Sequence, residues 1–327
     1  MPAKGMQTPI SRRRFVAVLA SAIPLAKMGA AAAAVARPVH WRGIAMGAQA
    51  EIVLLHPEAA VARKALAAAV LEIIRLENLF SLYEPNSEIC RLNRVGYIDA
   101  PSPDLVRLLS EARSISAATA GAFDVTVQPF FLAYQRHSGA EPPAAEIVQA
   151  RGLVDQRKLR ISPAKLAFAR QGMAVTLNGI AQGYMSDRVS ELLRRHGFDR
   201  TLVNLGEIKA NGAGPDGRGW PLSIAQPDNS GGMLEQLRLT NRAVATSAAS
   251  GHRFNPQGSL HHLIAPASGR PSNDYQSLSV LAPTATLADG LSTGLSLLRP
   301  DALASIVSDF TNVEVIAKTT SGVLLRI

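Results

Sequence analysis

The chain has 327 residues, of which 47% are hydrophobic and 18% are charged, so it is expected to fold as a globular protein. Its formal net charge of +9 would suit nucleic acid, but no stripe of Arg and Lys interleaved with aromatic residues marks a nucleic-acid surface. Five positive charges precede residue 37, where no acidic residue lies, and without them the net charge falls from +9 to +4. We therefore expect no nucleic-acid partner.

The first 36 residues have the features of an export signal. The sequence S-R-R-R-F-V at residues 11–16 matches the twin-arginine pattern, and the apolar stretch after it is too short to span a bilayer. A small-residue cleavage site follows at residues 34–36. We predict a twin-arginine signal peptide over residues 1–36, a single domain over 37–327, a periplasmic location and no stable membrane insertion after cleavage. An uncleaved anchor is the alternative.

Hydrophobic spacing and turn residues divide the first part of the mature chain into elements. We predict strand–turn–strand over 40–55, a helix over 57–80, an irregular segment over 81–93, a helix from Pro103 to about Ala118, and a glycine turn into an extended piece over 119–129. Cys90 is the only cysteine, and packing is favoured over a nucleophilic role for it.

The second part of the chain is richer in strands. We predict two short strands over 165–177, a helix that opens at 178–184 and continues to His196, a strand over 201–210, a glycine-rich turn over 212–219, further strands, a helix around Asp289, and a final helix with a hairpin over 312–327. This irregular order of strands and helices indicates the α+β class and not a doubly wound sheet.

Asp289 and Thr293 are the most informative polar pair. They lie four residues apart in a predicted helix with Thr286 as its N-cap, so they share one face. A carboxylate and a hydroxyl placed in this way can both ligate one hard cation. Alternatively, Asp289 supports the first helical turn and Thr293 bonds to a backbone carbonyl.

A glycine-bearing segment at residues 179–183 lies where a helix is predicted to begin. The unsatisfied N–H groups of a helix start suit a phosphate, and glycines let a ligand approach closely. The alternative is a glycine turn that only allows tight packing. The segment is not a Walker motif, and the chain has no G-x-G-x-x-G that opens a βαβ unit, so a nicotinamide fold is disfavoured.

Seven short motifs occur in an order that resembles one known family, the bacterial FAD:protein FMN transferases or ApbE proteins. They are M-G-A at 46–48, F-S-L-Y-E-P-N-S-E-I-C-R-L-N at 80–93, G-A-F-D-V-T-V-Q-P at 121–129, N-G-I-A-Q-G-Y-M-S-D at 178–187, A-T-S at 245–247, H-L-I-A-P-A-S-G at 262–269 and A-D-G-L-S-T at 288–293. The resemblance covers residues 43–298. It implies mixed and antiparallel sheets with packed helices, in an ApbE-like (T-fold-like) architecture.

The resemblance also implies an activity. Such enzymes cut the pyrophosphate of FAD and transfer FMN to a Thr or Ser hydroxyl of a flavoprotein, releasing AMP, with a divalent ion that is usually Mg²⁺. By this analogy Asp289, Thr293 and the backbone carbonyl of Ala181 hold the ion, and Asp289 is also catalytic. The implied FAD contacts are Met46, Tyr83, Ala122, Phe123, Asp124, Thr176, Gln182, Ile264 and Ser292.

Two of the implied roles have alternatives in the residues themselves. His262 matches the family's histidine and is the candidate base for the acceptor hydroxyl, because histidine titrates near neutral pH. Alternatively, His262 or His261 only orients a loop. Tyr83 can pack its face on a flat ring, or it is a partly buried core residue.

The chain departs from the family pattern at several places. Thr176 replaces an Asp, Gln182 replaces a Lys, Ala265 replaces an Asp, one glycine is missing before Glu207, and Ala248-Ala249 replace a glycine. The G-E-I and T-S-A variants, with the twin-arginine signal, resemble the NosX branch associated with nitrous-oxide respiration. The implied acceptor is then a membrane flavoprotein that supplies electrons to that reductase.

Three other functions are kept open. The chain is alternatively a metal-dependent FAD pyrophosphatase, a non-catalytic periplasmic FAD-binding protein, or an exported structural protein. The departures at Thr176 and Ala265 favour the binding protein, whereas the intact Asp289 and Thr293 pair disfavours the structural one.

Overall fold

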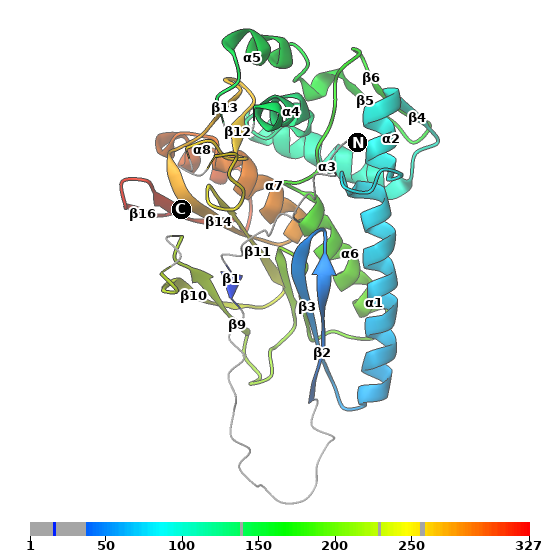
Figure 1. Cartoon of the computed structure of the whole chain (residues 1–327). Helices are drawn as coiled ribbons and strands as arrows, with labels where there is room; N and C mark the ends of the chain where they lie inside the picture. The colour runs from blue at the N-terminus through cyan, green and yellow to red at the C-terminus, as the bar shows by residue number, and fades with distance from the viewer. Residues whose placement is uncertain (1–15, 18–36, 138–139, 228–229, 256–258) are drawn as a thin grey trace, which may run out of the picture.

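An antiparallel sheet of eight strands forms the centre of the computed structural model, which describes residues 16–17, 37–137, 140–227, 230–255 and 259–327 (Figure 1). The strands, in sheet order, are β16 (Leu324–Arg326), β15 (Glu314–Thr319), β14 (Tyr275–Ala282), β11 (Arg242–Ala248), β8 (Ile208–Asn211), β7 (Thr201–Asn204), β3 (Ala48–His56) and β2 (Arg37–Ala45). Apart from β1 (Val16–Ala17), the predicted signal peptide lies outside the described residues.

The two faces of this sheet are covered differently. Three helices, α1 (Ala59–Phe80), α6 (Ala181–Arg195) and α7 (Ala285–Leu295), pack on one face. The other face lies against β9 (Trp220–Ala225) and β10 (Met233–Leu239), which form a small sheet with β1.

Burial on both faces explains the apolar composition of the central strands. In β3, Ile52 and Leu54 join the core under the helices, while Val53 and Leu55 join the core under β9 and β10. Successive residues of a strand point to opposite faces, so a strand covered on both sides reads as a continuous apolar run.

The remaining elements gather beyond one end of the sheet (Figure 1). They are α2 (Glu88–Val95), β4 (Tyr97–Asp99), α3 (Pro103–Ala118), η1 (Val125–Val127), α4 (Gln128–Arg136), α5 (Ala144–Arg151), η2 (Gln156–Lys158), β5 (Leu159–Ile161), β6 (Lys165–Phe168), β12 (Ile264–Ala265) and β13 (Arg270–Pro271), while η3 (Pro300–Ala302) and α8 (Leu303–Val307) follow α7. None of the helices in the described ranges is both long and apolar enough to cross a membrane.

The first hairpin, the three long helices and the closing hairpin lie where the sequence predicts them. The turn between β2 and β3 places Met46 at φ 48° and Gly47 at φ 72°, the left-handed pair that a two-residue hairpin needs. Ser102 caps α3 through a bond from the amide of Leu105, with proline in the first turn, as expected.

Five sequence-based expectations about local structure are wrong. The segment expected to be irregular contains α2, and the expected extended piece is the 3₁₀ turn η1 and the helix α4. The single strand expected over 201–210 is the hairpin β7–β8, and within 165–177 there is one strand, β6, because its partner β5 lies earlier. Thr284, and not Thr286, is the N-cap of α7.

Candidate active site

A cavity of about 400 Å³ opens where the start of α6, the middle of α7 and the end of β11 meet α4 and the segments around Phe123 and His262. It collects ten of the predicted site residues among its lining: Tyr83, Ala122, Phe123, Asp124, Thr176, Gln182, His262, Ile264, Asp289 and Thr293. These residues are far apart in the sequence, so the fold brings the motifs to one place.

Asp289 and Thr293 lie one turn apart on α7 and both line the cavity, as the spacing predicts. Asp289 is 5% exposed, and its Oδ2 accepts a bond of 3.0 Å from the amide of Gly183 on α6. This bond orients the carboxylate at the cavity floor. The Thr293 hydroxyl lies 3.4 Å from the carbonyl oxygen of Gly179.

Three residues from the predicted set lie outside the cavity lining among the described residues: Met46, Ala181 and Ser292. Ala181 is the first residue of α6 and is fully buried. Gly179, two residues earlier, does line the cavity and has its carbonyl beside Thr293. The geometry therefore favours Gly179 over Ala181 as the source of a carbonyl oxygen.

Ser292 lies behind the cavity wall and joins a chain of hydroxyl groups. Its Oγ donates to the carbonyl of Asp289 and lies 2.9 Å from the Oγ of Ser247, which in turn is 3.4 Å from the Oγ1 of Thr293. Ser247 lines the cavity and was not predicted as a site residue. Its only signal in the sequence was its place in the A-T-S motif.

His262 faces the cavity with one ring nitrogen fixed by the backbone. Its Nδ1 is 3.0 Å from the carbonyl oxygen of His252. A carbonyl can only accept, so Nδ1 carries the hydrogen and Nε2 is the basic nitrogen. His261, by contrast, is fully buried, burial lowers its pKa, and its ring contacts Asn273. The two histidines therefore have different surroundings, and His262 is the one that lines the cavity.

Asp124 lines the cavity, but its carboxylate is largely engaged within the protein. Oδ1 accepts from the amide and hydroxyl of Thr126, and Oδ2 accepts from the amide of Gln156. Burial raises the pKa of Asp124. The residue thus shapes the segment that follows Phe123 and links it to the start of η2.

Gln182 and Glu207 are two further polar residues that line the cavity. The side-chain Nε2 of Gln182 donates to the carbonyl oxygen of Leu205. A Cβ added to Gly206 would lie 2.2 Å from this Nε2. Glu207 accepts from the amide of Thr246. Sequence reasoning noted both positions as departures from the family pattern, but it did not identify Glu207 as a lining residue.

In the described part of the chain, the acidic residues that line the cavity are not balanced by basic ones. Asp124, Glu207 and Asp289 line it, whereas no Lys or Arg does so among the residues that the structure describes. The same ranges hold no cluster of three His, Cys, Asp or Glu side chains fit for a metal ion. A cation at the floor would thus need hydroxyl and carbonyl oxygens as well.

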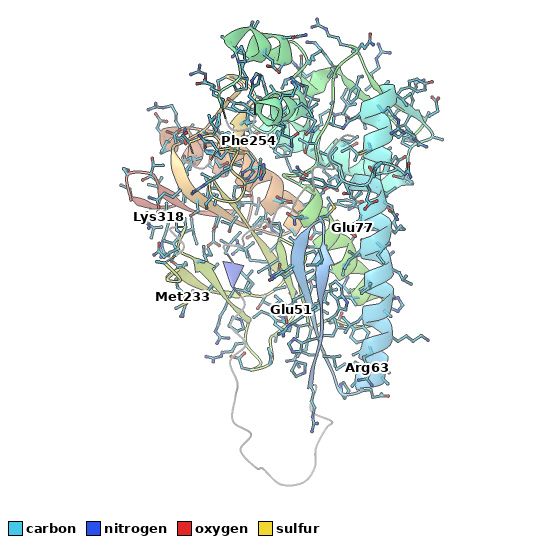
Figure 2. All side chains as sticks on the ribbon, viewed as in Figure 1. Glu51, Arg63, Glu77, Met233, Phe254 and Lys318 are labelled. Atoms are coloured by element: carbon cyan, nitrogen blue, oxygen red, sulfur yellow. The ribbon has the colours of Figure 1, made fainter. Side chains whose placement is uncertain are left out.

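The rim of the cavity is aromatic and partly open. Tyr83 lines the cavity and remains 65% exposed, which disfavours the core alternative for it. Phe131 of α4 meets the ring of Phe254 edge to face, and Figure 2 shows Phe254 close to α4. Flat apolar rings at an open mouth can receive a planar ligand.

Known proteins resemble this chain in sequence. The profile of the ApbE family matches residues 46–317. FAD:protein FMN transferases of Haemophilus influenzae and Vibrio cholerae are 30% and 28% identical over 263 and 299 residues, which cover 75% and 88% of this chain and 76% and 90% of theirs.

Solved structures agree with the family match. The flavin transferase ApbE from Vibrio cholerae superposes with a TM-score of 0.77 at 26% identity and covers 89% of this chain and 97% of its own. The apo flavinyl transferase ApbE of Pseudomonas stutzeri gives 0.75 at 25% identity, with 89% and 95% covered. The expected α+β, ApbE-like architecture is confirmed. The chain belongs to the ApbE family.

Proposed function

We propose that this protein transfers FMN from FAD to a Thr or Ser hydroxyl of a flavoprotein, releases AMP, and requires a divalent ion, Mg²⁺ in the first instance. Family membership and the names of its relatives support flavin transfer. The observation that carries the proposal is the convergence of Asp289, Thr293 and His262 on one cavity. FAD is the substrate and the modified flavoprotein is the partner.

The lining of the cavity supports the metal requirement. FAD brings a negatively charged pyrophosphate, and the described lining offers three carboxylate residues and no Lys or Arg to neutralise it. Asp289, Thr293 and the Gly179 carbonyl present the oxygen ligands that Mg²⁺ prefers. Such an ion, when bound, stabilises the charge that develops on the phosphoryl oxygens.

His262 performs the proton transfer in this proposal. Its Nε2 takes the proton of the acceptor hydroxyl, because Nδ1 is held protonated by the His252 carbonyl. The hydroxyl oxygen then forms a bond to the phosphorus of the FMN moiety, and the bond from that phosphorus to the bridging oxygen breaks. The bridging oxygen leaves with AMP, so no co-reactant is needed.

A flavinylation assay tests this function. The purified protein is incubated with FAD, Mg²⁺ and a flavoprotein domain that carries a Thr acceptor, and in-gel fluorescence and acceptor mass are read. We expect a gain of one FMN that EDTA abolishes. Asp289→Ala should lose transfer, whereas Asp301→Ala, at an exposed position outside the cavity, should keep it.

Other outcomes would select the alternatives. FMN and AMP released into solution without acceptor labelling would indicate a metal-dependent FAD pyrophosphatase. FAD that binds without turnover, with two different acceptors, would indicate a binding protein. Transfer by Asp289→Ala at the normal rate would overturn the metal assignment.

We also propose a periplasmic location and an acceptor in the electron supply to nitrous-oxide reduction. The twin-arginine pattern at residues 11–16 supports export, and the G-E-I and T-S-A variants support the NosX-type branch. Replacing Arg12 and Arg13 by lysine should retain the protein in the cytoplasm, as cell fractionation would show. Flavinylation of an unrelated acceptor with equal efficiency would contradict the acceptor proposal.

A further inference from the structure

Helices α6 and α7 run antiparallel and side by side (Figure 1), and three polar contacts join them at every fourth residue. Gly179, just before α6, meets Thr293; Gly183 meets Asp289; and Asp187 meets Ala285 and Thr286. We call these three contacts the α6–α7 ladder. The first two contain the residues proposed to hold the ion, whereas the third lies outside the active-site cavity.

The third contact holds the beginning of α7. Oδ1 of Asp187 accepts from the amide of Ala285 at 2.9 Å, and Oδ2 accepts from the amide and hydroxyl of Thr286 at 2.8 and 2.7 Å. Thr284 satisfies the next two amides of the helix, those of Leu287 and Ala288. The amides of the first three residues of α7, which have no partner within the helix, are thus all bound, two of them by Asp187.

Burial and a neighbouring charged group also act at the beginning of α7. Burial of the carboxylate raises the pKa of Asp187, although its bonds to α7 and the nearby Lys209 oppose the shift. The Lys209 ammonium itself donates to the carbonyl of Pro283, in the turn just before α7. A negative group also interacts favourably with the positive end of the helix. The start of α7 is therefore clamped from α6 and from β8.

Close packing couples the position of α7 to that of α6 along the whole α6–α7 ladder. A Cβ on Gly183 would lie 2.2 Å from the carbonyl oxygen of Ala285 and 2.8 Å from the Cβ of Asp289, so the two helices touch backbone to backbone. A Cβ on Gly179 would likewise lie 2.7 Å from Oγ1 of Thr293. Any axial shift of α7 would thus move both Asp289 and Thr293 relative to Gly179.

We propose that Asp187 is a positioning residue that sets the register of α7 against α6 and so sets the affinity of the Asp289–Thr293 pair for its divalent ion. The inference rests on the proposed metal requirement. Asp187 touches neither the cavity nor its lining pair, so it acts only through the helix. Partners that orient metal ligands typically change affinity by roughly 10- to 100-fold when removed.

The test compares metal dependence in three variants of the full-length protein. Asp187→Asn keeps the shape but opposes an amide N–H with an NH₂ group, and Thr286→Val removes one of the three bonds. Glu88→Gln is the control, because Glu88 clamps the amide and hydroxyl of Ser102 at the start of α3, which carries no metal ligand. Mn²⁺ binding, read from its electron paramagnetic resonance signal without FAD, gives a measurement independent of turnover.

For Asp187→Asn we expect the affinity for Mn²⁺ to fall by roughly 10- to 100-fold. The Mg²⁺ concentration for half-maximal transfer should rise by a similar factor. The rate at saturating Mg²⁺ should recover, KM for FAD should then be normal, and Thr286→Val should shift less. Glu88→Gln should lose thermal stability without a change in metal affinity.

Two results would overturn the inference: unchanged Mn²⁺ affinity in Asp187→Asn, or an equal loss of rate at every Mg²⁺ concentration. If Asp187→Asn does not fold, Thr286→Val decides, and unchanged Mn²⁺ affinity in that variant is the contrary result. A wild-type protein that transfers FMN without any divalent ion would instead contradict the proposed function, so the two failures are distinguishable.

Discussion

At the scale of single residues, the backbone selects which nitrogen of His262 is basic. The His252 carbonyl holds the hydrogen on Nδ1, and the side chain lines the cavity. We predict that His262→Gln lowers the rate of transfer by about 10²- to 10⁴-fold, the usual contribution of a general base. FAD binding should be nearly unchanged, because the substitution leaves the Asp289 and Thr293 pair intact.

Quenching of flavin fluorescence would measure binding, and acceptor mass would measure transfer. His196→Gln is the control, since His196 is the exposed C-cap residue of α6 and lies outside the lining. A His262→Gln protein that transfers FMN at the normal rate would leave His262 with a loop-orienting role only.

Glu77 supports the turn at the cavity edge. It lies on α1 beside the tip of the β2–β3 hairpin (Figure 2), and its carboxylate accepts from the amide of Met46. Met46 has φ 48°, which is uncommon for a residue with a side chain, and Ala48 after it lines the cavity. The structure thus places Met46 in the turn and Ala48, two residues later, in the lining of the cavity.

Burial, reinforced by Glu84, raises the pKa of Glu77. A carboxylic acid whose pKa is raised by folding adds to the free energy of unfolding while it is protonated. This contribution is lost as the pH rises through the pKa of the folded state. The glutamine of the Glu77→Gln variant does not ionise. The free energy of unfolding of the variant minus that of wild type should therefore increase from pH 4.5, the ordinary pKa of glutamate, to neutral pH. Urea denaturation across this range would measure it, and a constant difference would contradict the prediction.

At the scale of elements, hydrophobic spacing and capping residues predicted the long helices. They gave the wrong prediction where two sequence features favoured different structures. In α4, the β-branched residues before Pro129 favour an extended chain, yet proline suits a first helical turn, and Phe130, Ala133 and Tyr134 bury one helical face. In α2, Ile89 and Leu92 have helical spacing, and Ser87 caps the amide of Cys90, but the element has only eight residues. Tertiary packing decided both cases.

The site divides in a similar way between local and distant information. The placement of Asp289 and Thr293 follows from helix geometry alone and was predictable. The contacts from Thr293 to Gly179 and Ser247 join residues 114 and 46 positions apart, and only the packing of α6, α7 and β11 brings them together. Sequence reasoning therefore predicted the placement of the pair on one helix face, but it could not place the Gly179 carbonyl beside Thr293.

The close contact between α6 and α7 makes Gly183 sensitive to added volume. In Gly183→Ala the new Cβ must separate the helices, because backbone atoms of Ala285 cannot move aside as a flexible side chain could. We predict a loss of about 1–3 kcal/mol in the free energy of unfolding, together with weaker Mn²⁺ binding, since the Gly183 amide orients Asp289.

Thermal unfolding and Mn²⁺ titration would measure the two effects. Gly152→Ala is the matched control, because a Cβ there meets only the carbonyl of Gln149 at 3.3 Å, outside the cavity. Equal stability of the two glycine variants would show that the helices can separate without cost.

At the scale of the whole molecule, the sheet, its helices and the smaller elements enclose a cavity whose described lining carries carboxylates and no Lys or Arg. The pyrophosphate of FAD would meet unfavourable charge there unless a divalent ion accompanies it. A family member with lysine at position 182 would have a positive group of its own, whereas Gln182 is neutral. The two ligands should therefore stabilise this protein together much more than separately.

We predict that FAD with Mg²⁺ raises the thermal midpoint by several degrees in the absence of an acceptor, and that FAD with EDTA raises it little. A ligand at a hundred times its dissociation constant adds about 2.7 kcal/mol of stability. Asp289→Ala should show the same small shift with and without Mg²⁺, because it lacks the carboxylate that anchors the ion. Differential scanning calorimetry would measure the midpoints. A full shift from FAD in EDTA would mean that neutral groups such as Gln182 and the backbone amides near Gly179 bind the pyrophosphate unaided.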